Sequence, residues 1–168
     1  MQIERLFDIL TSYVNRLPDK PMLHHKAEGI WHPLSASEVQ QKVQQVAASF
    51  VRMGHNTRLK NIEESEKIAI IANNRPEWVI VDFATQLSGA VLVPIYPSVT
   101  EQEWSYMLQE AKVSTVFISD RHIYKKLKLI QHEITSLKHV YCFDPIEGVT
   151  HWSELLQPFS NEELEGLQ

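Results

Sequence analysis

The chain has 168 residues, a formal net charge of −5 and a sequence pI near 5.9. This acidic balance argues against nucleic acid as a partner, because a phosphate-binding surface normally shows as an excess of basic residues. Hydrophobic residues make up 43% and charged residues 22%, as in ordinary globular proteins, and no apolar run approaches the roughly 20 residues of a transmembrane segment. Cys142 is the single cysteine, which excludes an internal disulfide and favours a reducing compartment.

The first part of the chain predicts a helix followed by a strand pair. Residues 4–17 carry apolar side chains at helical spacing, and Pro18 would end that helix. Two short strands over residues 22–25 and 30–34 follow, joined by a turn around Gly29. The side chains expected on one side of the helix are Leu6, Ile9, Leu10 and Tyr13.

A second helix is marked at both ends. Ser35 and Glu38 form a capping box, and Gly54 follows the last apolar position. A polar, irregular stretch over residues 55–65 then leads to the main sheet. The apolar stripe of this helix consists of Val39, Val43, Val46, Ala47, Phe50 and Val51.

Residues 67–72 begin a predicted strand–helix–strand unit. They are a run of Ile and Ala, which is typical of a strand covered on both faces of a parallel sheet. Asn74 and Glu77 resemble a capping box, and Pro76 suits a first helical turn, where its missing N–H costs nothing. A helix is therefore predicted to begin at this point.

The end of this helix and the next strand are marked by glycine and proline. Gly89 is placed where a left-handed residue would end the helix, and residues 90–93 form the second apolar run. Pro94 and Pro97 would end that strand, because proline has no N–H to donate to a ladder.

The same alternation continues to residue 143. Thr100 would cap a helix, and residues 113–118 and 140–143 are predicted strands. The sequence therefore predicts an α/β fold with a mostly parallel sheet flanked by helices. The helix between the last two strands has the apolar stripe Ile123, Leu127, Ile130 and Ile134.

The junctions of these elements resemble those of one enzyme family. They read NNRPEW after the first strand (73–78), PIYP beyond the second (94–97) and TEQE at the start of the next helix (100–103). These sequence segments resemble those in the N-terminal part of long-chain acyl-CoA synthetases, which belong to the adenylate-forming superfamily. The segments that resemble the opening helix, the next strand and a late helix of that family are LFDIL (6–10), VFISD (116–120) and HWSEL (151–155).

The resemblance implies a two-step reaction. A fatty acid carboxylate attacks the α-phosphate of Mg·ATP to give acyl-AMP and pyrophosphate, and the CoA thiol then displaces AMP. The Ser/Thr/Gly-rich loop with which the family holds ATP phosphates is absent, since the five glycines are too widely spaced to form one. We therefore predict an N-terminal fragment of a long-chain-fatty-acid–CoA ligase, inactive alone and without catalytic residues or a cofactor of its own. ATP, Mg and CoA would serve the full-length enzyme. The alternatives are a non-enzymatic α/β binding module and a partner-docking module.

The resemblance also predicts how the chain is divided. Residues 1–54 would belong to a lobe completed by further chain, residues 55–65 would be a polar linker, and residues 66–160 a doubly wound α/β subdomain followed by a tail over 161–168. The stripe of Val39, Val43, Val46 and Phe50 would then lose part of its cover. A homo-oligomer is the expected substitute, because large apolar patches are uncommon on monomers.

Four side chains are predicted to line a substrate or CoA rim. Tyr96 lies between two prolines beyond a strand, and the resemblance places this turn near the acyl and pantetheine route. Lys125, Lys126 and Lys128 form a basic cluster, and some relatives in the superfamily place basic side chains of the matching segment against CoA phosphates. The alternative for the lysines is a solvated helix face.

Four polar residues at the start of the predicted helix have two interpretations. Asn73, Asn74, Arg75 and Glu77 follow a parallel strand, where open α/β sheets bind ligands. The simpler interpretation is that Asn74 and Glu77 cap the helix while Arg75 forms a local ion pair.

The remaining residues with reactive side chains give no further site. No metal site is predicted, because His24 and His25 are neighbours on a strand and point to opposite faces. Cys142 lies in an apolar strand and is expected to be inert. A cytoplasmic location is expected, with peripheral membrane association as an alternative for the full-length enzyme.

Overall fold

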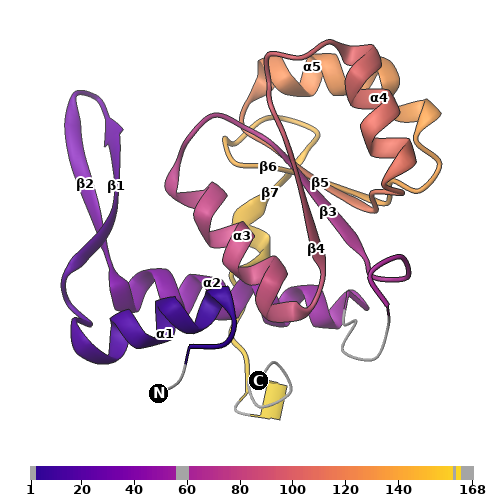
Figure 1. Ribbon diagram of the computed structural model, residues 1–168. Helices are drawn as coiled ribbons and strands as arrows, with labels where there is room; N and C mark the ends of the chain where they lie inside the picture. The colour runs from indigo at the N-terminus through magenta and orange to yellow at the C-terminus, as the bar shows by residue number, and fades with distance from the viewer. Residues whose placement is uncertain (1–2, 56–60, 161, 164–168) are drawn as a thin grey trace.

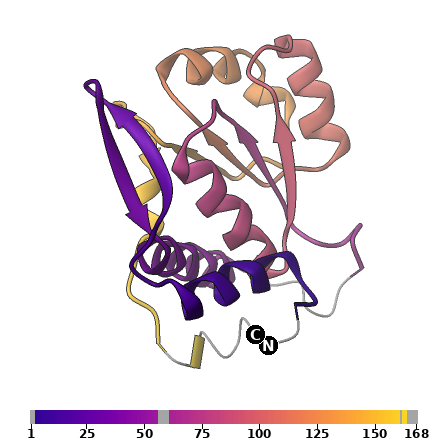
Figure 2. The same cartoon turned by 60° about the vertical axis from the view of Figure 1, so that its left-hand side comes forward.

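The protein folds as a small hairpin and a larger parallel sheet with helices on both faces (Figures 1 and 2). The computed structural model describes residues 3–55, 61–160, 162 and 163. Its helices are α1 (Leu6–Arg16), α2 (Ala36–Arg52), α3 (Pro76–Ser88), α4 (Glu101–Glu110) and α5 (Arg121–Ile130), with 3-10 turns η1 (Gln131–Glu133) and η2 (Trp152–Leu155). Its strands are β1 (Pro21–Ala27), β2 (Ile30–Ser35), β3 (Lys67–Ile71), β4 (Val91–Ile95), β5 (Thr115–Ile118), β6 (His139–Cys142) and β7 (Thr150–His151).

The parallel sheet confirms the predicted fold class. Within the described residues its strand order is β4-β3-β5-β6-β7, whereas β1 and β2 form a separate antiparallel pair. Alternate side chains of β3 enter different cores: Ile68 and Ile70 face α2 and α3, while Ala69 and Ile71 face α4 and α5. Figure 1 shows α4 and α5 together at the top, with α1, α2 and α3 on the other face. No helix in the described ranges is both long and apolar enough to cross a bilayer.

The apolar stripe of α2 is covered by its own chain. Val39, Val46 and Phe50 are 0% exposed and Val43 is 1% exposed, in one core with β3 and α3. The prediction that these four side chains lose part of their cover was therefore wrong. The cause is that α3 and β3 pack directly on α2, and with this finding the physical reason for self-association disappears.

The helix ends follow the expected chemistry with one exception. The capping boxes at Ser35 and Thr100 are confirmed, and Gly89 ends α3 in the left-handed region with a φ of 80°. The predicted capping by Asn74 was wrong. Arg75 occupies the N-cap of α3 without a side-chain cap bond, because Pro76 takes the first helical position and the Glu77 carboxylate binds the Arg75 guanidinium instead.

Two further predictions were wrong because of the surroundings of each residue. Strand β4 continues through Pro94 to Ile95, since it is the edge strand and needs ladder bonds on one side only. Of the predicted apolar stripe of α1, Leu10 is buried in the core, but Leu6 and Ile9 are 64% and 47% exposed. The prediction that Leu6 and Ile9 face the core with Leu10 was therefore wrong.

The segment after β6 closes the structure against α2. The predicted late helix is only the 3-10 turn η2, and His151 before it belongs to β7. Buried Ser49 of α2 donates a hydrogen bond to the Leu155 carbonyl (2.8 Å), and Arg52 donates to the Pro158 carbonyl (2.8 Å) and pairs with Glu163 (2.6 Å). This C-terminal strap, residues 152–160 with 162 and 163, therefore contacts α2 from late in the chain.

Candidate functional site

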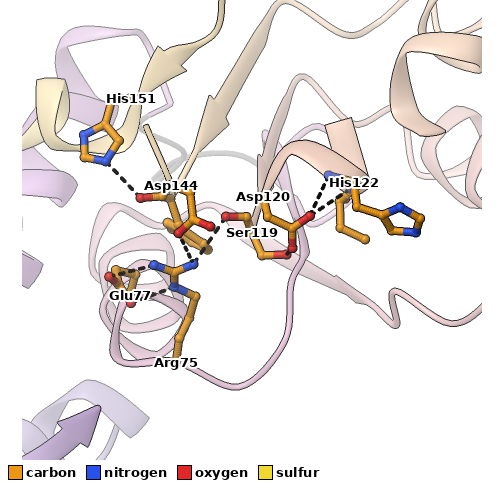
Figure 3. Close-up of polar contacts among 9 residues, drawn as sticks. Arg75, Glu77, Ser119, Asp120, His122, Asp144 and His151 are labelled. Atoms are coloured by element: carbon orange, nitrogen blue, oxygen red, sulfur yellow. Dashed lines mark hydrogen bonds and ion pairs between the residues drawn. The ribbon is translucent and has the colours of Figure 1, made fainter. Parts of the chain in front are cut away.

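The candidate site lies at the carboxyl edge of the parallel sheet. The chain leaves β3 toward β4 on one side and leaves β5 toward β6 on the other. The loops after β3 and β5 therefore flank the switch point of the sheet, where open α/β folds generally bind ligands. Figure 3 shows the side chains that these loops and the loop after β6 bring together.

Arg75 connects three of these loops. Its guanidinium donates to both Glu77 carboxylate oxygens (2.9 and 3.1 Å), to Asp144 Oδ1 (3.0 Å) and to the Ser119 carbonyl (3.3 Å), as drawn in Figure 3. It also lies over the Phe143 ring, 5.1 Å from its centroid. An ion-pair cluster of the chain itself thus joins the three loops at the switch point and lines the groove between them and β1. We call it the Arg75 cluster (Arg75, Glu77, Asp144 and the Ser119 carbonyl).

The electrostatics of the Arg75 cluster favour the charged forms. Burial acts to raise the pKa of Glu77, but hydrogen bonds and the charge of Arg75 outweigh it, and the pKa is lowered. Burial likewise acts to lower the pKa of Arg75, and its bonds to Glu77 and Asp144 raise it overall. The local ion pair predicted for Arg75 is confirmed. Its second partner, Asp144, was missed.

Other polar groups fix the loops beside this cluster. Asp120 accepts the backbone N–H groups of His122 and Ile123 and caps α5, while the Ser119 hydroxyl donates to it. His151 Nε2 lies 2.9 Å from the Phe143 carbonyl (Figure 3). The position of Asp120, between a strand and a helical stripe, could have identified it as a cap, whereas nothing near Asp144 in sequence signals its partner.

A pocket of about 450 Å³ opens on the other side of β3. Its walls come from the turns after β3 and β4 and from the first turn of α3, and no charged side chain lines it within the described structure. Tyr96 is 79% exposed there, as its position between prolines predicted. Four polar side-chain groups around the pocket make no hydrogen bond within the described part of the chain. They are the side-chain amides of Asn73 and Asn74, the Trp78 indole and the Tyr96 hydroxyl. The pocket, here called the Tyr96 pocket, is lined by Ala72, Asn73, Asn74, Trp78, Pro94, Ile95, Tyr96 and Pro97.

The three lysines lie on α5 and differ in their surroundings. Lys125 and Lys128 are exposed, and Lys128 lies over the Tyr124 ring. Lys126 is half-buried, pairs with Glu101 (3.3 Å) and lies 5.2 Å from the centre of the Trp104 ring. Because the Trp104 indole donates to the Tyr96 carbonyl (3.2 Å), one buried side chain connects Lys126 to the Tyr96 turn.

The remaining candidate residues are the histidines of β1, Cys142 and the acidic side chains of the described residues. The described residues contain no cluster of three or more His, Cys, Asp or Glu side chains that could hold a metal. His24 and His25 line a shallow groove between β1 and the start of α3. Cys142 is fully buried, and burial raises the pKa of its thiol, which keeps it protonated and unreactive.

The chain is similar in sequence to long-chain acyl-CoA ligases. It is 30% identical over 141 residues to the long-chain-fatty-acid–CoA ligase heimdall of Drosophila melanogaster, covering 79% of this chain and 20% of that protein. It is 24% identical to long chain acyl-CoA synthetase 4 of Arabidopsis thaliana, covering 84% and 21%. The chain thus spans about a fifth of the length of these relatives.

Solved structures share the fold at lower identity. Acetoacetyl-CoA synthetase from Streptomyces lividans matches with a TM-score of 0.77 at 17% identity, covering 92% of this chain and 25% of that one. A long-chain-fatty-acid–CoA ligase from Archaeoglobus fulgidus matches with a TM-score of 0.72 at 16% identity, covering 90% and 29%. Residues 10–163 match the AMP-binding enzyme family, and the chain therefore belongs to that family.

Proposed function

We propose that this chain is the N-terminal part of a long-chain-fatty-acid–CoA ligase, which forms acyl-AMP from a fatty acid and Mg·ATP and then transfers the acyl group to CoA. The observation that carries the proposal is the family match over residues 10–163, in a chain that spans only about a fifth of its ligase relatives. In this reading the chain supplies scaffold and one rim of the site, and the groups that bind ATP and Mg come from the rest of the protein.

The Tyr96 pocket is the part of this chain proposed to meet substrate. Its uncharged amide, indole and phenol groups suit the uncharged parts of the substrates, namely the acyl chain and the pantetheine arm of CoA, better than phosphate or carboxylate. Lys125, Lys126 and Lys128 supply positive charge for the CoA phosphates. The contact between Lys126 and Trp104 supports a common rim, because Trp104 also binds the Tyr96 turn.

The isolated chain is expected to be inactive, because its sequence has no glycine-rich loop in which backbone N–H groups could converge on polyphosphate. The test compares pyrophosphate release from ATP and palmitate by two proteins. One is the isolated chain. The other is a chimera in which residues 1–168 replace the corresponding segment of the Drosophila relative.

We expect no pyrophosphate release by the isolated chain and measurable release by the chimera. Pyrophosphate release by the isolated chain, abolished by a mutation within it, would contradict the expected inactivity. A folded chimera without activity, beside an active parent ligase, would contradict the proposed function and favour a non-enzymatic binding or docking module.

A further inference from the structure

His55 is a buried histidine at the amino edge of the sheet, opposite the candidate site. It lies three residues after the end of α2, its side chain is 2% exposed, and its backbone N–H donates to the Phe50 carbonyl (2.9 Å). Its Nε2 lies 3.1 Å from the Thr115 hydroxyl of β5. The ring therefore joins the end of α2 to the central part of the sheet.

The second ring nitrogen of His55 is a buried polar atom with no hydrogen-bond partner among the described residues. The nearest acidic group is the Glu66 carboxylate, whose Oε2 lies 3.9 Å from His55 Nδ1. A buried polar atom without a partner costs free energy, so this arrangement is held in place by the packing around it.

The groups around His55 act against its protonation, with one exception. Aromatic Phe50 of α2 packs 5.9 Å away, and the His139 ring of β6 lies at 6.3 Å. Burial lowers the pKa of His55, and the charges of His139 and Lys138 lower it further, whereas the Glu66 carboxylate acts to raise it. Among the described residues, the charged groups facing His55 are thus Glu66 before β3 and Lys138 and His139 at the start of β6.

We propose that His55, with its unpaired Nδ1 and with Glu66 and His139 beside it, is an acid-sensitive latch that holds α2 on the amino edge of the sheet when neutral and releases it when protonated. Protonation would place a second N–H, on Nδ1, in a buried position. The only acidic side chain near it in the described structure is Glu66, whose Oε2 is 3.9 Å from Nδ1, too far for a hydrogen bond. Release relieves that cost by exposing the ring to water.

The sign of the pH effect follows from the lowered pKa. The unfolded chain takes up the proton at a pH of about 6.5, before the folded chain does. The contribution of His55 to folding is therefore complete above about pH 6.5 and is lost as the pH falls toward the folded pKa. Within this window the folding equilibrium constant decreases by up to about tenfold per pH unit.

The test follows urea unfolding of the 168-residue chain between about pH 7.5 and 5, which lies above the ordinary carboxylate range. His55→Gln keeps a polar side chain near Thr115 but cannot titrate, so its acid loss of stability in this window should be smaller than that of the wild type. Exposed His132 of η1 gives a matched control: His132→Gln should retain the wild-type acid loss. Glu66→Gln should deepen that loss, because the carboxylate partly compensates the imidazolium.

A direct titration of the wild-type chain keeps the test decisive if His55→Gln does not fold. The His55 ring proton, followed by NMR, should titrate below about pH 6.5, with the amide of His55 losing exchange protection over the same range. A His55 that titrates at or above the value of a free histidine would overturn the proposal. An acid loss that is unchanged in His55→Gln would do the same.

Discussion

The two sides of β3 at the carboxyl edge are built in opposite ways. On the β5 side, the Arg75 cluster pairs a guanidinium with two carboxylates and a carbonyl, and these charged side chains form one wall of a groove beside β1. On the β4 side, the Tyr96 pocket is open and lined by uncharged side chains. The comparison teaches that one side of β3 presents charges that are paired within the chain, while the other side presents uncharged polar side chains.

The strongest test of this contrast is the removal of Arg75. Arg75→Ala should lower the free energy of unfolding by about 2–3 kcal/mol, because Glu77 and Asp144 would remain as unpaired acids. The loss should be smaller than for a fully buried pair, since Asp144 is 49% exposed. Urea unfolding at pH 7 measures it, with exposed Arg121→Ala as the control. Equal losses in the two variants would contradict a special role for the Arg75 cluster.

The same cluster predicts a second acid transition, below that of His55. Because the folded pKa of Glu77 is lowered, its contribution to stability is present above the unfolded value of about 4.3 and is lost as the pH falls through the folded pKa. Glu77→Gln should be less stable than the wild type at pH 7, and the difference should shrink toward pH 3. A difference that stays constant with pH would show that Glu77 acts through packing alone.

The lysines should affect CoA and leave the first step unchanged. In the chimera, joint replacement of Lys125, Lys126 and Lys128 by Ala should raise the KM for CoA several-fold without altering acyl-AMP formation. The sharpest comparison is between Lys126→Ala and Lys128→Ala, since only Lys126 contacts the Trp104 side chain that binds the Tyr96 turn. An unaltered CoA dependence would leave the lysines as a solvated helix face.

The smallest effect on stability is expected in the Tyr96 pocket. Tyr96→Ala should change the free energy of unfolding by no more than about 0.5 kcal/mol, because the ring is exposed and its hydroxyl binds no described residue. In the chimera the same change should raise the KM for CoA or fatty acid. A loss of stability comparable with that of Arg75→Ala would remove the distinction between the two sides of β3.

The sequence was sufficient for features that depend on neighbouring residues. The capping box at Ser35, the left-handed Gly89 and the alternation of strands and helices each have a local cause, and all three are confirmed. Strand β4 can contain Pro94 because it lies at the edge of the sheet. The strand order determines this position, and it cannot be recognised from a short segment of sequence.

The candidate site could be predicted only in part, because some of its contacts join residues that are distant in sequence. An ion pair for Arg75 was suggested by Glu77 two positions away. Asp144, the second partner of Arg75, is 69 positions away in sequence and meets it only because β3 and β6 end at the same edge. The unpaired nitrogen of His55 likewise depends on packing between distant elements.

The C-terminal strap has a consequence for how the chain reaches this structure. Ser49 and Arg52 find their partners 106 to 111 residues later, so these bonds close the longest loops among those described here. Contacts of such high sequence separation form late, because the entropy of loop closure must be met first. During synthesis α2 would leave the ribosome long before Leu155 exists. The order of translation therefore leaves the carboxyl end of α2 without these hydrogen-bond partners until the strap emerges.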